Sequence, residues 1–103
     1  MTPASVLRAA AALIEHEGWT QGVLRNYATG ARCAYGAIFD VTIFHPVTPQ
    51  QTELLDRAHS TLLDFLHMKK GLSVSAWNDD PSRTQAEVIT TLRAAADQAE
   101  AAK

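Results

Sequence analysis

Two segments of the sequence begin with the same pair of helix-start residues. A threonine suited to cap a helix precedes a proline suited to its first turn in Thr2-Pro3 and again in Thr48-Pro49. After each pair, apolar residues recur every third or fourth position, which gives a helix one face to bury. The sequence therefore predicts helices over about residues 2–17 and 49–70.

A third helix start lies near the end of the chain. Thr84-Gln-Ala-Glu87 has the spacing of a capping box, in which the Thr84 hydroxyl accepts from the N–H of Glu87 and the Glu87 carboxylate accepts from the N–H of Thr84. An apolar stripe follows at Val88, Leu92 and Ala95. These residues predict a helix over about residues 84–99.

The segment 32–44 carries two conflicting patterns. Its run AIFDVTIF is rich in β-branched and aromatic residues, which favours a strand. The strand alternation is poor, however, because Ile38 and Phe44 would lie on the polar face. Helical spacing instead groups the apolar residues on one side, opposite Asp40, and we favour a helix; the grouped residues are Ala34, Ala37, Ile38, Val41 and Phe44.

The connecting segments complete the predicted fold. Glycine, threonine and asparagine between residues 18 and 31 predict a connector with one helical turn at 23–27. Lys69-Lys70-Gly71 would end the helix predicted over residues 49–70. Alternation of apolar residues with Ser73 and Ser75 predicts an extended piece that places Trp77 beside Trp19 or Phe65. We therefore predict one all-α domain, residues 1–103: a compact bundle of about four helices (2–17, 32–44, 49–70 and 84–99) with a short extended segment at 72–79.

Charge and cysteine content narrow the function classes. Nine basic and eleven acidic residues leave a net charge of −2, which disfavours binding to nucleic acid. Cys33 is the only cysteine, which excludes an internal disulfide and a multi-thiolate metal site. No apolar stretch approaches the ~20 residues of a membrane span, so we expect a cytoplasmic protein with no membrane partner.

The stretch Trp77-Asn-Asp-Asp-Pro-Ser-Arg83 is the one concentration of polar and aromatic chemistry. Asn78 and its neighbours suit turns that close through side-chain bonds to the backbone. Asp79 and Arg83 are left over, and they could pair with each other at i, i+4. The alternative is a ligand, metal or partner site formed by Trp77, Asn78, Asp79 and Arg83, in a pocket that Trp19 and Tyr35 also line.

The remaining reactive side chains form no recognisable set. His59 and His67 lie eight residues apart on one predicted helix, about 12 Å along its axis, too far to share one ion. Cys33 has the apolar setting of a small core residue. No phosphate-binding loop or dinucleotide fingerprint is present, so we predict no catalytic residue, no metal ligand and no cofactor.

Three stretches, in order, resemble a known family: VLRAAAALIEHEGWTQG, CAYGAI and WNDDPSRTQAEVITTLRAAA. They are similar to a family of small uncharacterised proteins of actinobacteria and their bacteriophages. The resemblance implies a wholly helical fold, which supports a helix at 32–44, and a setting in a bacterial or phage-infected cell. It carries over no activity and no catalytic residue.

These observations favour a small non-enzymatic accessory protein that acts through protein–protein interaction. Its partner would be another protein or a second copy of itself in a homodimer. The alternative is a small-molecule-binding or metal-binding protein, or an enzyme, whose pocket surrounds Trp77, Asn78, Asp79 and Arg83. A pair of DNA-binding helices is a third and weaker hypothesis.

Overall fold

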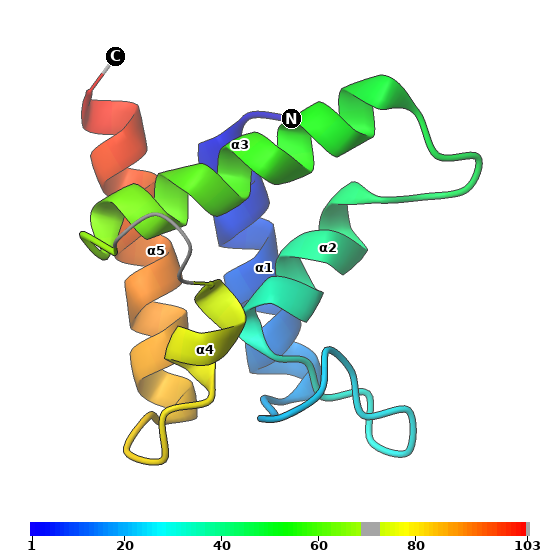
Figure 1. Ribbon diagram of the computed structural model, residues 1–103, viewed down its shortest axis with the longest axis vertical. Coiled ribbons are helices and arrows are strands. Elements are labelled where there is room, and N and C mark those ends of the chain that lie inside the picture. Colours follow the sequence, from blue (N-terminus) through cyan, green and yellow to red (C-terminus); the bar gives the residue numbers. More distant parts are fainter. Residues whose placement is uncertain (69–72, 103) are drawn as a thin grey trace.

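The structure is a computed structural model that describes residues 1–68 and 73–102 (Figure 1). Within these residues the chain forms five helices and no multi-residue strand, which confirms the all-α class. The helices are α1 (Pro3–Glu17), α2 (Ala34–Thr42), α3 (Pro49–Phe65), α4 (Val74–Asn78) and α5 (Gln85–Ala101). None of the helices described is long and apolar enough to cross a membrane.

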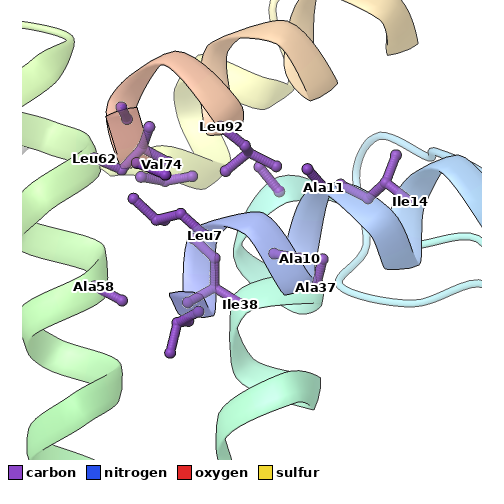
Figure 2. Packing of buried hydrophobic residues seen from close by; sticks show 14 of the residues in the cluster. Leu7, Ala10, Ala11, Ile14, Ala37, Ile38, Ala58, Leu62, Val74 and Leu92 are labelled. Carbon is purple, nitrogen blue, oxygen red and sulfur yellow. The ribbon is translucent and has the colours of Figure 1, made fainter. Parts of the chain in front are cut away.

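Helix α1 forms the centre of the fold. It packs lengthwise against α5 and on another side against α2, while α3 crosses over these helices near the chain ends (Figure 1). Leu7, Leu62, Val74 and Leu92 gather where α1, α3, α4 and α5 meet (Figure 2). Many other buried positions are alanine, and a methyl side chain allows two helix backbones to approach closely; they include Ala10, Ala11, Ala37, Ala58, Ala95 and Ala96.

The predicted helix starts are confirmed, with one correction. Thr2 and Thr48 each accept a bond from the backbone N–H three residues on, and in both cases the bond is returned. Thr84 Oγ1 also accepts from the Glu87 N–H, at 3.2 Å. The predicted return bond from the Glu87 carboxylate is wrong, because that carboxylate accepts from the guanidinium of Arg83 at 2.9 Å.

Residues 34–42 form a helix, as favoured over a strand. Cys33 caps it, with its Sγ accepting from the Gly36 N–H at 3.3 Å. Ala34, Ala37 and Ile38 are buried on one side, as helical spacing predicted. The prediction was wrong for Phe44, which lies beyond the end of α2 at Thr42 and is exposed. Burial of this face decides the local conformation over the strand preference of the β-branched residues.

The third helix ends earlier than predicted. α3 stops at Phe65, and His67 adopts a left-handed conformation with φ +52°. The N–H of His67 donates to Asp64 and that of Met68 to Leu63, which closes the helix end. The predicted last turn at Lys69-Lys70 and the cap at Gly71 lie outside the described residues.

The predicted extended segment at 72–79 is wrong where it is described. Val74–Asn78 is the short helix α4, capped by Ser73, whose Oγ accepts from the Ala76 N–H at 3.1 Å. Val74 and Asn78 are both fully buried, a spacing of four that suits one face of a helix. The alternation with serines therefore reflected a helix cap rather than a strand period.

Candidate functional site

Residues 18–33, here called the connector, link α1 to α2 through bends at 21–24 and a turn at 27–29, with isolated bridge pairings at Trp19, Arg25 and Arg32 (Figure 1). The predicted helical turn at 23–27 is wrong. Arg32 pairs with Trp19 in the parallel sense on one side and with Arg25 in the antiparallel sense on the other. Four backbone hydrogen bonds hold these pairings, each from an N–H to a carbonyl oxygen. The N–H of Thr20 donates to Arg32 (3.1 Å), that of Arg32 to Gly18 (3.0 Å), that of Asn26 to Ala31 (2.8 Å) and that of Cys33 to Leu24 (3.2 Å).

The connector reverses direction where its composition permits. Gly22 and Gly30 have φ of +81° and +85°, which residues with a Cβ rarely adopt. Between them, the Asn26 Oδ1 accepts from the N–H of Ala28 at 2.9 Å and closes a turn. The turns form instead of a helical turn at 23–27 because they bring Arg32 back alongside Arg25, where the two residues pair.

Asn78, a predicted site residue, fastens the connector to α4. Its side chain is fully buried and its Oδ1 accepts from Trp19 Nε1 at 2.6 Å and from the Ala34 N–H at 2.9 Å. Its Nδ2 donates to the Thr20 carbonyl and to Asp79 Oδ1, both at 3.0 Å. Both N–H donors of this amide and both lone pairs of its oxygen are therefore committed inside the protein.

Asp79 and Gln21 add a second row of bonds between the connector and α4. Asp79 Oδ1 accepts from the Gly22 N–H at 2.9 Å. Gln21 Nε2 donates to the carbonyls of Asn78 and Asp80, at 3.0 and 2.8 Å. We call the group Trp19, Gln21, Asn78 and Asp79 the clamp, because its bonds fix the connector against α4.

Arg83 is also engaged locally, but not with Asp79. Its Nε donates to the Trp77 carbonyl at 3.0 Å, and the guanidinium carbon lies 4.4 Å from the centre of the Trp77 ring. A further ion pair joins it to Glu87, which corrects the predicted pairing with Asp79. Asp80, the other carboxylate of the stretch, has its pKa held below the ordinary value by the hydroxyl and N–H of Ser82.

The six residues of the hypothetical ligand pocket thus divide into separate groups. Trp19, Asn78 and Asp79 come together in the clamp, whereas Arg83 stacks on Trp77. Tyr35 makes an edge contact with His59 of α3, at 5.1 Å between ring centres. Sequence reasoning missed the clamp role of Gln21, and only its place two residues after a tryptophan could have drawn attention to it.

A small pocket of about 150 Å³ opens where the connector meets α4. Its lining consists of Gly22, Val23, Leu24, Cys33, Ser75 and Asp79. Cys33 is buried, as its apolar setting predicted, and burial raises the pKa of its thiol. A protonated thiol is a weak nucleophile. Asp79 supplies the one carboxyl group among these six lining residues.

The described residues contain no metal-binding group of histidine, cysteine and acidic side chains. In residues 1–68 and 73–102, no three His, Cys, Asp or Glu side chains are placed to hold one metal ion. His59 is half-buried between α3 and α2, and burial lowers its pKa.

The chain belongs to a family of unknown function, DUF6197, whose model matches residues 1–98. The match covers every helix almost to the end of α5, together with the connector and the clamp. No curated protein and no solved structure matches the chain.

Proposed function

We propose that this protein works by binding another protein through the exposed side of the connector, as a non-enzymatic accessory factor. One observation carries the proposal: three large apolar side chains are exposed within five residues. Val23 is 53% exposed, Leu24 49% and Tyr27 85%. We call these three residues the connector surface.

The rigid attachment of the connector supports this role. Exposed apolar residues on a loose loop would lose conformational entropy on binding, which weakens association. Here the clamp and the pairing with Arg32 fix the backbone of the connector in the folded protein. Most of the conformational entropy of the connector is therefore already lost on folding rather than on binding. The polar residues Asn78 and Arg83 support the proposal indirectly, because their internal bonds leave them little capacity for chemistry.

The setting that we propose is the cytoplasm of a bacterium or of a phage-infected cell, by resemblance to the family. The partner is another protein or a second copy of the chain. Phe39, Phe44 and Val47, at the end of α2 and just beyond it, are also exposed and provide a matched comparison surface.

The test compares two double variants, each of which replaces one valine and one aromatic residue by serine. Val23→Ser with Tyr27→Ser removes much of the connector surface, and Phe44→Ser with Val47→Ser removes the comparison surface. Self-association is measured by sedimentation velocity, and partner capture from the host lysate by quantitative cross-linking and mass spectrometry.

We expect the connector variant to lose the complex by at least about tenfold while the comparison variant retains it. Equal retention by both variants, with unchanged melting temperatures, would refute the proposal. Loss in the comparison variant alone would move the binding surface to the end of α2.

A second candidate function is small-ligand binding in the pocket beside Asp79, and the pocket itself is the observation in its favour. Its test is titration with small amines, monitored by the backbone resonance of Asp79 in the wild type and in Asp79→Asn. Saturable binding that Asp79→Asn abolishes would support this candidate.

A further inference from the structure

We infer that the edge of the connector at Arg25 binds an extended peptide segment that places a lysine side chain in the pocket beside Asp79. This inference rests on the proposed function, since it specifies the partner of the connector surface. It follows from three features: unpaired backbone groups, an adjacent pocket, and the charge in that pocket.

The backbone of Arg25 presents an open pairing edge. In its antiparallel pair with Arg32, the flanking bonds are made by the Leu24 carbonyl and the Asn26 N–H. In such a pair the N–H and carbonyl of the central residue point to the opposite side. Within the described part of the chain, neither group of Arg25 makes a hydrogen bond. An extended peptide satisfies both with one residue, as in strand addition to a sheet edge.

Arg32 itself is paired on both sides, with Arg25 on one and with Trp19 on the other. Of these two outer residues, Arg25 is the one that directly follows the pocket-lining residues Val23 and Leu24 in the chain. We therefore place the added peptide along Arg25.

The pocket beside this edge suits a lysine side chain. Val23 and Leu24 contribute to its lining and can contact the aliphatic stem, while Asp79 supplies a carboxylate for the ammonium group. Asp79 Oδ1 already accepts from Gly22 and Asn78, but Oδ2 makes no hydrogen bond within the described residues. Charge complementarity thus selects a cationic side chain over an apolar or acidic one.

The cations of the connector itself do not fill the pocket. The Arg25 guanidinium lies over the Tyr27 ring, 5.0 Å from its centre, and Arg32 pairs with Asp40 at 3.0 Å. Neither arginine lines the pocket.

The experiment uses defined peptides and the whole protein. The probe is acetyl-Thr-Val-Lys-Val-Thr-amide, titrated into the isotopically labelled protein and followed by backbone NMR. Companion peptides replace the lysine with norleucine or glutamate, and a fourth carries N-methyl groups on its two valine amides. We expect the lysine peptide to bind at least about fivefold more tightly than any companion, with the largest shifts at Leu24, Arg25 and Asp79.

Two protein variants separate the backbone contact from the charge contact. Arg25→Pro removes an N–H that has no internal partner, and its matched control, Arg25→Ala, removes only the side chain. Arg25→Pro should weaken binding about fivefold or more, which is what loss of one hydrogen bond implies, while Arg25→Ala should bind like the wild type. Asp79→Asn keeps an Oδ1 acceptor for Gly22 and should abolish the preference for lysine over norleucine.

Equal affinity for lysine and norleucine peptides would overturn the inference. Binding of the N-methylated peptide as tight as that of the unmodified peptide would also overturn it, and this test does not depend on whether Arg25→Pro folds. Free lysine methyl ester is a further control. The inference fails if the ester causes chemical-shift changes as large as those caused by the lysine peptide. If the peptides fail while the Val23 and Tyr27 variant still loses its partner, the inference fails and the proposed function stands. If that variant keeps its partner, the proposed function fails whatever the peptides do.

Discussion

The helical core and the clamped connector are held together by different interactions. Around α1 the buried residues are aliphatic, many of them alanines, and their contribution scales with the area removed from water. At the connector, a few hydrogen bonds to Asn78 and Asp79 fix the backbone, and each leaves a buried or constrained partner if it is removed. The comparison teaches that the core is stabilised by burial of apolar area over many residues, whereas the shape of the connector surface depends on a few polar atoms of Asn78 and Asp79.

The largest expected effect tests the core side of this comparison. Leu7→Ala opens a cavity where α1 meets α3 and α4, and we expect it to lower the free energy of unfolding by about 2–5 kcal/mol. Urea denaturation measures the loss. Leu24→Ala, at a half-exposed connector position, is the control and should cost less than about 1 kcal/mol. Similar losses for the two variants would contradict a core centred on α1.

Removing the amide at position 78 tests the connector side. Asn78→Ala leaves the Trp19 indole N–H, the Ala34 N–H and the Thr20 carbonyl without their partners, and we expect a loss of about 2–3 kcal/mol. The Trp19 indole resonance should move furthest, and amides of the connector should exchange faster than those of α5. Uniform acceleration across all helices would show that Asn78 supports the core rather than the connector.

A substitution at Gly36 probes the contact between the two regions. A Cβ at this position would overlap the carbonyl oxygen of Leu24, so the connector must move away from α2. Alanine is the better helix former, yet we expect Gly36→Ala to destabilise the fold by about 1–2 kcal/mol. Differential scanning calorimetry and connector amide shifts provide the measurement. A gain in melting temperature would mean that the connector yields without cost.

The smallest expected effect concerns the pH dependence of the core edge. Burial lowers the pKa of His59, so the folded state favours the neutral ring beside Tyr35, while Asp56 opposes the shift. The unfolded chain then binds more protons, and stability is lost as the pH falls through the ordinary pKa of about 6.5 toward the lower folded value. The ring is only half-buried, so the loss should stay under about 1 kcal/mol.

Thermal melts at pH 7.5 and 5.0 measure this effect, with His59→Gln as the control that should remove it. If the wild type instead gained stability on acidification, the pKa of His59 would be raised in the folded state, which would mean that an anion stabilises the charged ring.

Helices whose signals are local and apolar could be predicted from the sequence. Thr2 and Thr48 cap their helices as expected, and the spacing of Ala34, Ala37 and Ile38 identified α2 against a contrary propensity. The end of α3 could not be placed, because His67 rather than a glycine adopts the left-handed conformation there. Such a choice depends on packing beyond the helix itself.

The candidate site was harder to predict because its partners are distant in sequence. The stretch at 77–83 was expected to serve local turns, which holds for Asp80 and Ser82. Asn78 instead bonds Trp19 and Ala34, which are 59 and 44 residues away. Nothing in the composition around an asparagine distinguishes a local turn partner from a buried long-range one, so only the assembled fold revealed the clamp.

The long reach of Asn78 also has a consequence for how the protein matures. Loop closure over such separations occurs late compared with the formation of a single helix. During synthesis, the connector cannot acquire its final shape until residue 78 has left the ribosome and α4 has docked. A partner that recognises this shape would therefore bind only fully synthesised and folded chains.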